Sequence, residues 1–220
     1  MSVDPTRLPF LAALYEQYLE DQDAAAYSHK VARSYNQGTL ERLSEHAYPK
    51  VRRAAVLALG FSADYSANAA LGRALVDEDR TVRMLADESI RHVWARAGAA
   101  EHQHALAIII RLNSAQHYRE AADRATQLIA AAPGYAEAWN QRAIARFGMR
   151  QYLEAIADCH QTLEINPYHF GAAAGMGQAY MQLGDAASAL DSFRHALRLN
   201  RDLEGARIQV AKLTRLLEGK

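Results

Sequence analysis

A spacing of about 34 residues recurs through the C-terminal half of the chain and limits its possible folds more than any other feature. The matched pairs include Ala155 with Ala189, Tyr118 with Tyr152, and Pro133 with Pro167. A fixed period of this length is typical of a helix–turn–helix unit that stacks on its neighbours, because a single unit cannot bury its apolar side alone. The sequence therefore predicts three consecutive units, at residues 102–135, 136–169 and 170–203.

The residues inside these units resemble a known family. Each unit has a Trp or a small residue near its start, as at Trp139, and the third unit contains an Ala-x3-Phe step from Ala189 to Phe193. Together with Pro167 at the end of a unit, this pattern resembles the tetratricopeptide repeat. The strings AEAWNQRA at 136–143 and NPYHFGAAAGMG at 166–177 are similar to those of bacterial tetratricopeptide proteins, some of which carry HEAT-like segments before them.

The resemblance implies antiparallel helix pairs followed by a capping helix. We place the pairs at 102–114 with 118–131, 136–148 with 152–165, and 170–182 with 186–199. The turns carry Gly148 and Gly184, and Asp202 is predicted to cap a final helix at 203–218. The fold class that follows is all-α, an α-solenoid of HEAT-like repeats, three tetratricopeptide repeats and a capping helix.

A different repeat precedes the tetratricopeptide part. The pairs Val51-Arg52 and Val82-Arg83 each follow a polar turn and open a helix that contains alanine. This arrangement resembles short HEAT-like repeats over about 39–97, in which Asp79 could cap its helix and pair with an arginine of the neighbouring repeat. We place N-terminal helices and HEAT-like repeats at 1–98 and the tetratricopeptide domain with its cap at 99–220. The short junction at 98–101 predicts that the two parts stack directly.

Arg52 and Arg83 allow two interpretations. They could form an Asp–Arg ladder inside the stack, or a basic concave face for DNA, as in HEAT-like DNA repair enzymes. The chain has 25 basic and 25 acidic residues, a balance that argues against binding nucleic acid through bulk charge. The nucleic-acid-binding or repair protein using the Arg52/Arg83 face is kept as the alternative function.

Composition and the start of the chain exclude several other classes. Half of the residues are apolar, good helix formers predominate, and no alternating strand pattern occurs. Cys159 is the single cysteine, so an internal disulfide is excluded, and we interpret it as a small buried apolar group. The first residues lack the basic start and long apolar run of a signal peptide, and the apolar run at 105–110 is too short for a bilayer. We expect a cytoplasmic location and no membrane partner.

The sequence contains no recognisable catalytic set. It has neither a nucleophile elbow nor a phosphate-binding glycine loop, and His102 and His104 are two residues apart, on different sides of a helix. No cofactor and no metal site are therefore predicted. An enzyme of the HEAT-like bilin-lyase kind is a third interpretation, for which no catalytic residue stands in the sequence.

In the tetratricopeptide family, the first helix of each repeat lines a concave groove. Carrying this register onto the chain predicts a peptide-binding groove of apolar side chains with a few amides. Its residues are Gln103, Leu106, Ile110 and Asn113 from the first repeat, Glu137, Asn140, Ile144 and Phe147 from the second, and Gly171, Ala174, Gln178 and Met181 from the third, with Gly175 beside them.

Three glycines inside the helix 170–182 need a reason, because glycine costs a helix about 1 kcal/mol relative to alanine. Gly177 falls at the family's own small position, where paired helices touch. Gly171 and Gly175 either leave the groove open for a ligand or allow close packing of one helix on the next.

The function predicted from these features is non-catalytic protein–protein interaction, as an adaptor, scaffold or assembly factor. The partner would be a protein or peptide of unspecified identity, and no oligomeric state is predicted for the chain. Domains of the carboxylate-clamp type, which hold chaperone C-termini, use lysine and asparagine at groove positions where this chain has Leu106, Ile110 and Ala174. That class of partner is therefore not expected.

Overall fold

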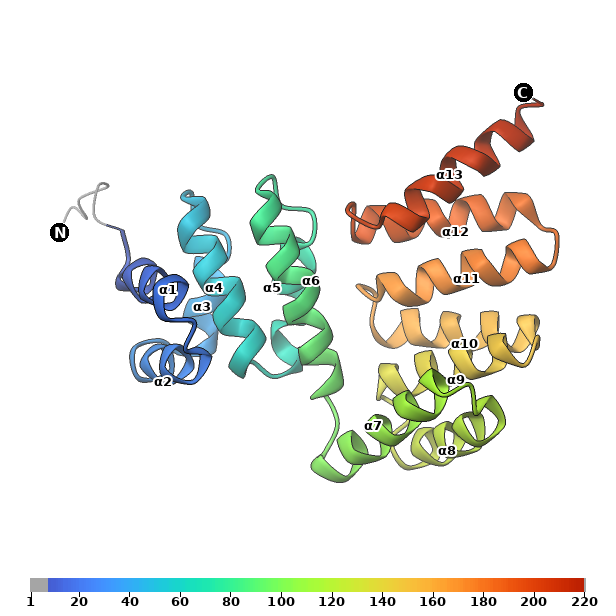
Figure 1. The fold of residues 1–220 in the computed structure, drawn as a ribbon, viewed down its shortest axis with the longest axis horizontal. Coiled ribbons are helices and arrows are strands. Elements are labelled where there is room, and N and C mark those ends of the chain that lie inside the picture. The colour runs from blue at the N-terminus through green and yellow to red at the C-terminus, as the bar shows by residue number, and fades with distance from the viewer. Residues whose placement is uncertain (1–7, 220) are drawn as a thin grey trace. The chain divides into compact units, whose positions relative to one another are not determined.

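The computed structural model describes residues 8–219, and every regular element in that range is helical. The helices separate into two compact units, and the chain passes from one to the other between Val93 and Trp94, near the end of α6. The predicted all-α class, a solenoid of helix pairs, is confirmed (Figure 1). The boundary predicted at residue 98 lies a few residues farther along the chain than this division.

The first unit is built from short helices joined by tight turns. Its elements are α1 (Phe10–Asp21), α2 (Ala24–Ser34), α3 (Gln37–Leu43), α4 (Pro49–Ser62), the 3-10 helix η1 (Tyr65–Ala67), α5 (Asn68–Ala74) and most of α6 (Arg80–Ala95). Helix α4 is buried over most of its length. Its own side chains are small or branched apolar groups on nearly all sides, as expected for a helix packed inside the unit. Gly60 of α4 lies against Ser89 of α6, where a side chain would collide with that serine.

The second unit consists of helix pairs that follow one another along the chain. The pairs are α7 (Ala100–Ser114) with α8 (Tyr118–Ala131), α9 (Ala136–Gly148) with α10 (Tyr152–Ile165), and α11 (Phe170–Gln182) with α12 (Ala186–Leu199), followed by α13 (Glu204–Leu217). The bounds of α8 to α12 are those predicted from the repeat spacing. Asp202 is not the cap of α13 as predicted: Leu203 occupies that position and no side chain bonds there.

The turn inside each pair has the same geometry in all three pairs. A residue with left-handed backbone recurs once per repeat at the same register, at Gln116 (φ 63°), Arg150 (φ 62°) and Gly184 (φ 78°). Only the last is the glycine that this conformation favours. Gly148, which was predicted to serve the turn, is instead the last residue of α9 and lies against the ring of Tyr118. The equal turns support the assignment of 102–135 as the first of three repeats.

Candidate functional site

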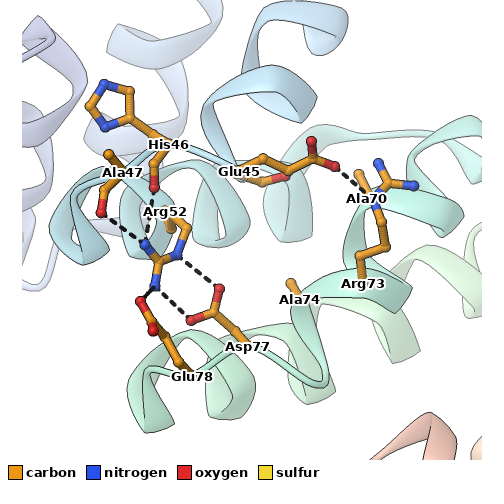
Figure 2. Close-up of a pocket in the computed structure, with 10 residues that line it drawn as sticks. Glu45, His46, Ala47, Arg52, Ala70, Arg73, Ala74, Asp77 and Glu78 are labelled. Atoms are coloured by element: carbon orange, nitrogen blue, oxygen red, sulfur yellow. Dashed lines mark hydrogen bonds and ion pairs between the residues drawn. The ribbon is translucent and has the colours of Figure 1, made fainter.

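An open pocket of about 600 Å³ lies at one edge of the first unit, between the turn before α4 and the turn before α6. Figure 2 shows that its charged side chains point toward one another. Arg73 pairs with Glu45 at 2.6 Å, and Arg52 pairs with Asp77 through two bonds of 2.8 Å. The pocket therefore holds ion pairs formed within the chain.

Arg52 is the central residue of this pocket and is only 6% exposed. Besides Asp77, it reaches the carboxylate of Glu78 at 3.2 Å and donates to the carbonyl oxygens of His46 and Ala47 at 3.0 and 3.1 Å. All of these partners lie in the turn between α3 and α4 or in the turn between α5 and α6. Arg52 therefore joins successive repeats, and its guanidinium is not available to a phosphate backbone.

The neighbouring Arg53 makes the ion pair that the sequence predicted for Asp79. Its Nε donates to Asp79 Oδ1 at 2.9 Å, and the same carboxylate caps α6 by accepting from Val82 N at 2.9 Å. The bonds from Arg53, together with the cap, hold the pKa of Asp79 at about 2, although burial opposes the shift. Asp79 is therefore ionised at neutral pH and fastens α4 to the start of α6.

Arg83 repeats part of the Arg52 arrangement one repeat later. It donates to the carbonyl oxygens of Asp77 and Glu78 at 2.8 and 3.0 Å. These two residues occupy the same positions in their turn as His46 and Ala47, the carbonyl partners of Arg52, occupy in the preceding one. The two arginines thus serve equivalent positions inside the stack. This geometry supports the interpretation as an Asp–Arg ladder. The interpretation as a DNA-binding face loses Arg52, because its guanidinium is bonded within the chain.

In the second unit, the predicted groove positions lie on one side of α7, α9 and α11. We call this side the first-helix face and define it by the exposed or half-buried residues Ile110, Asn140, Ile144, Phe147, Ala174, Gln178 and Met181. Ile110, Ile144 and Met181 are 38%, 43% and 37% exposed, which is high for apolar side chains of this size. The face therefore offers apolar surface on three successive helices, with two amides beside it.

Three predicted groove residues do not belong to this face. Leu106 is only 2% exposed, because Tyr135 and the end of α6 at Ala95 pack on the core around it. Asn113 is buried and donates to both the backbone and the side-chain oxygen of Gln141 at 2.9 Å. Gln103 points back to the preceding turn, where its amide bonds the carbonyl of Gly98 at 2.7 Å. Leu106 and Asn113 are therefore buried away from a ligand, and the amide of Gln103 is already bonded within the chain.

Glu137, also predicted in the groove, belongs to a buried polar cluster. Its carboxylate accepts from His169 Nε2 at 3.0 Å, from Asn140 at 3.0 Å and from Gln141 at 2.9 Å. Burial by itself raises the pKa of Glu137, but the hydrogen bonds from His169, Gln141 and Asn140 outweigh it, so the pKa lies below its usual value. The Glu137 carboxylate is thus committed to α11 and is not free for a partner.

The ring of Trp94 covers this cluster from the other side. It stacks on His169 with ring centroids 4.4 Å apart and also contacts Phe170 at 5.4 Å. Close by, Tyr135 donates to the carbonyl oxygen of Ala95 at 2.5 Å. The last turn of α6 therefore covers the N-terminal ends of α9 and α11, where Glu137 and Gly171 were expected to contact a ligand.

The glycines of α11 have different surroundings. A Cβ at Gly177 would lie 2.9 Å from the buried ring of Phe193, which confirms that paired helices touch there. A Cβ at Gly175 would meet only Cys159 Sγ, at an ordinary 3.6 Å, and one at Gly171 would lie 3.4 Å from His169. Gly175 thus faces the packed side of α10, and a larger residue there would press on α10 before it filled the first-helix face.

These surroundings predict opposite effects for the same substitution. Gly175→Ala should raise the free energy of unfolding by about 1 kcal/mol, because alanine suits a helix better and its methyl group fits. Gly177→Ala should lower it by about 1–3 kcal/mol, since the Phe193 ring must move within a full core. Urea unfolding followed by tryptophan fluorescence measures both, and equal effects of the two changes would contradict this account.

Asp158 forms a buried ionic cluster that holds the second repeat together. Its side chain is 2% exposed and pairs with Arg142 through bonds of 3.0 and 2.8 Å and with Arg146 at 2.6 Å. Arg142 also bonds the hydroxyl of Thr126 in α8 at 3.1 Å and lies over the ring of Trp139. The cluster joins α8, α9 and α10 and was not foreseen from the sequence.

Cys159 and the two histidines of α7 are the other residues whose chemistry the sequence raised. Cys159 is buried, and burial raises the pKa of its thiol to about 12, so it behaves as an apolar group. His102 and His104 line a pocket of about 350 Å³ on α7 and α8, where His102 lies 3.7 Å from Glu101. Within residues 8–219, no three His, Cys, Asp or Glu side chains are grouped to hold a metal ion. In the same range, no helix combines the length and the apolar character needed to cross a membrane.

Family models match both parts of the chain. The model for HEAT repeats matches residues 36–129, and the tetratricopeptide repeat model matches residues 146–213. The chain carries HEAT repeats followed by tetratricopeptide repeats. The HEAT match extends through α7 and most of α8, the pair whose turn matches those of the tetratricopeptide repeats.

Two named relatives match slightly less than half of the chain. A TPR repeat-containing protein of Rhizobium etli is 34% identical over 45% of this chain and 48% of its own length. The Hsp70-Hsp90 organizing protein of Triticum aestivum is 33% identical over 44% of this chain and 17% of its own length. The chain thus spans about half of the first relative and a smaller part of the second.

A solved structure shows the same fold over about half of the chain. The first TPR of Spaghetti (RPAP3), bound to the HSP90 peptide SRMEEVD, matches with a TM-score of 0.53 and 21% identity. The match covers 55% of this chain and 96% of that one. The stacked helix pairs of this chain therefore resemble those of a domain solved with a bound peptide.

Proposed function

We propose that the chain is a non-catalytic interaction module that binds a peptide or helix of a protein partner on the first-helix face. The main supporting observation is the exposure of Ile110 and Ile144 at equivalent positions of α7 and α9, and of Met181 on α11, three residues beyond the equivalent Gln178. One extended ligand could contact all three, which is how a repeat array gathers affinity from small contacts. Two of the comparisons support this proposal, since one relative is named an Hsp70-Hsp90 organizing protein and one matched structure holds a peptide.

The separation into two units suggests an adaptor role. Arg52, Arg53 and Arg83 of the first unit are engaged in contacts within that unit. In this proposal the surface of the first unit serves a second contact, while the first-helix face serves the peptide. Chaperone C-termini are not proposed as the peptide, because Leu106 is buried and Ile110 and Ala174 cannot pair with a carboxylate.

Peptide selection from a random display library on the whole chain tests the proposal, followed by affinity measurement for the enriched peptides. Ile144→Asp should weaken their binding at least tenfold, because it places a charge in the apolar contact without removing a core residue.

The matched control is Leu153→Asp, which makes the same kind of change at a side chain on α10 that is 68% exposed. It should leave binding unchanged. The proposal fails if the library yields no binding peptide, or if both variants lose affinity equally while circular dichroism shows intact helices.

A further inference from the structure

The first-helix face changes character where it reaches α13. This helix begins one repeat length after α11, and its buried Ala206 and Leu213 match the buried Ala172 and Ala179 of α11. The two helices therefore present equivalent positions to the same side. Continuing the face by the same spacing leads from Gln178 to Lys212 and from Met181 to Arg215.

Lys212 and Arg215 are exposed, and no hydrogen bond or ion pair joins either of them to another residue in 8–219. They lie three residues apart, so their charged ends can approach one ligand together. Arg207 of the same helix differs, because it pairs with Glu204 at 2.9 Å and bonds the carbonyl of Arg201. The unpaired positive charge of α13 is thus concentrated where the first-helix face ends.

The carboxylate predicted on this face is already engaged. Glu137 is held by His169 and two amides, so it cannot neutralise the cations of α13. The face consequently runs from apolar side chains on α7, α9 and α11 to two cations on α13. Two cations in a chain with balanced charge do not make a surface for a polyanion, but they suit one or two carboxylates.

We propose that the occupant of the first-helix face is a peptide segment in which an apolar stretch is followed by acidic residues. This inference rests on the proposed function. The apolar stretch lies on Ile110, Ile144 and Met181, and the acidic residues reach Lys212 and Arg215. The charge pairs fix the direction of the bound segment, because reversing it would place carboxylates on the apolar helices.

The test is a random peptide display library selected in parallel on three forms of the whole chain at low ionic strength. These are the unchanged protein, the double variant Lys212→Glu/Arg215→Glu, and the control Arg194→Glu/Arg198→Glu. The control makes the same change in charge on the exposed side of α12. Peptides selected on the unchanged protein should be enriched in Asp and Glu beside an apolar run. The α13 variant should bind them at least tenfold less tightly and should select Lys or Arg instead, whereas the control should select the original peptides.

The outcomes separate this inference from the proposed function. Enriched peptides that lose affinity for Ile144→Asp but show no acidic preference would overturn the role of α13 and leave the proposed function standing. The same holds if the α13 variant and the control select identical peptides. If no peptide is enriched on any form, the proposed function itself fails.

Discussion

Asp158→Ala is expected to lower the free energy of unfolding of the second unit by about 3–5 kcal/mol. The substitution removes the shared partner of Arg142 and Arg146, whose side chains are 11% and 25% exposed. Two guanidinium groups would then remain largely buried without a counter-charge, and breaking a buried pair in this way costs more than the pair contributes. Both tryptophans, Trp94 and Trp139, lie in the second unit, so urea unfolding followed by tryptophan fluorescence reports on it directly.

A matched control is Glu120→Ala on α8. Glu120 pairs with Arg124 one helical turn away, and both side chains are about half exposed. Surface pairs of this kind contribute about 0–1 kcal/mol, so the control should change little. Removing all three charges in Asp158→Leu/Arg142→Met/Arg146→Met should recover much of the loss. Equal small effects of Asp158→Ala and Glu120→Ala would show that the cluster does not hold the repeat.

The helix bounds of the second unit could be predicted because its spacing repeats. A residue that has an equivalent in the neighbouring repeat inherits its place in the helix pair, and the bounds of α8 to α12 followed from that alone. The turns were harder, since the left-handed positions hold Gln116 and Arg150, which sequence patterns do not mark. The packing of the helices on either side imposes the left-handed backbone at these two residues. This conformation costs conformational free energy in any residue other than glycine, so a short isolated peptide would not adopt it.

The candidate site was predicted less well, because burial depends on parts of the chain far away in sequence. Leu106 matches the exposed groove position of the family, yet the end of α6 and Tyr135 cover it. In the sequence, His169 has the position of an ordinary turn residue. Its role in binding Glu137 and stacking on Trp94 depends on the fold, which places these distant residues beside it. The exposed Ile144 and Met181, by contrast, follow directly from the repeat register.

Arg52→Ala is the second change expected to have a large effect, about 3–5 kcal/mol, now on the first unit. It removes the two bonds that Arg52 makes to the carboxylate of Asp77, which is 13% exposed at the side chain, and the bonds that Arg52 donates to the carbonyls of His46 and Ala47. Because the first unit contains no tryptophan, the loss should be followed by circular dichroism, which reports on the helices of both units.

Arg73→Ala is the matched control within the same pocket, since Arg73 and its partner Glu45 are 55% and 57% exposed. It should cost no more than about 1 kcal/mol. The two variants also decide between the interpretations of the arginine ladder. If Arg52→Ala left the unfolding transition unchanged but weakened binding to a duplex oligonucleotide, the arginine would serve a nucleic-acid surface. The bonds to Asp77, Glu78 and two carbonyls predict the reverse, because a guanidinium with that many partners inside the chain is placed to join repeats.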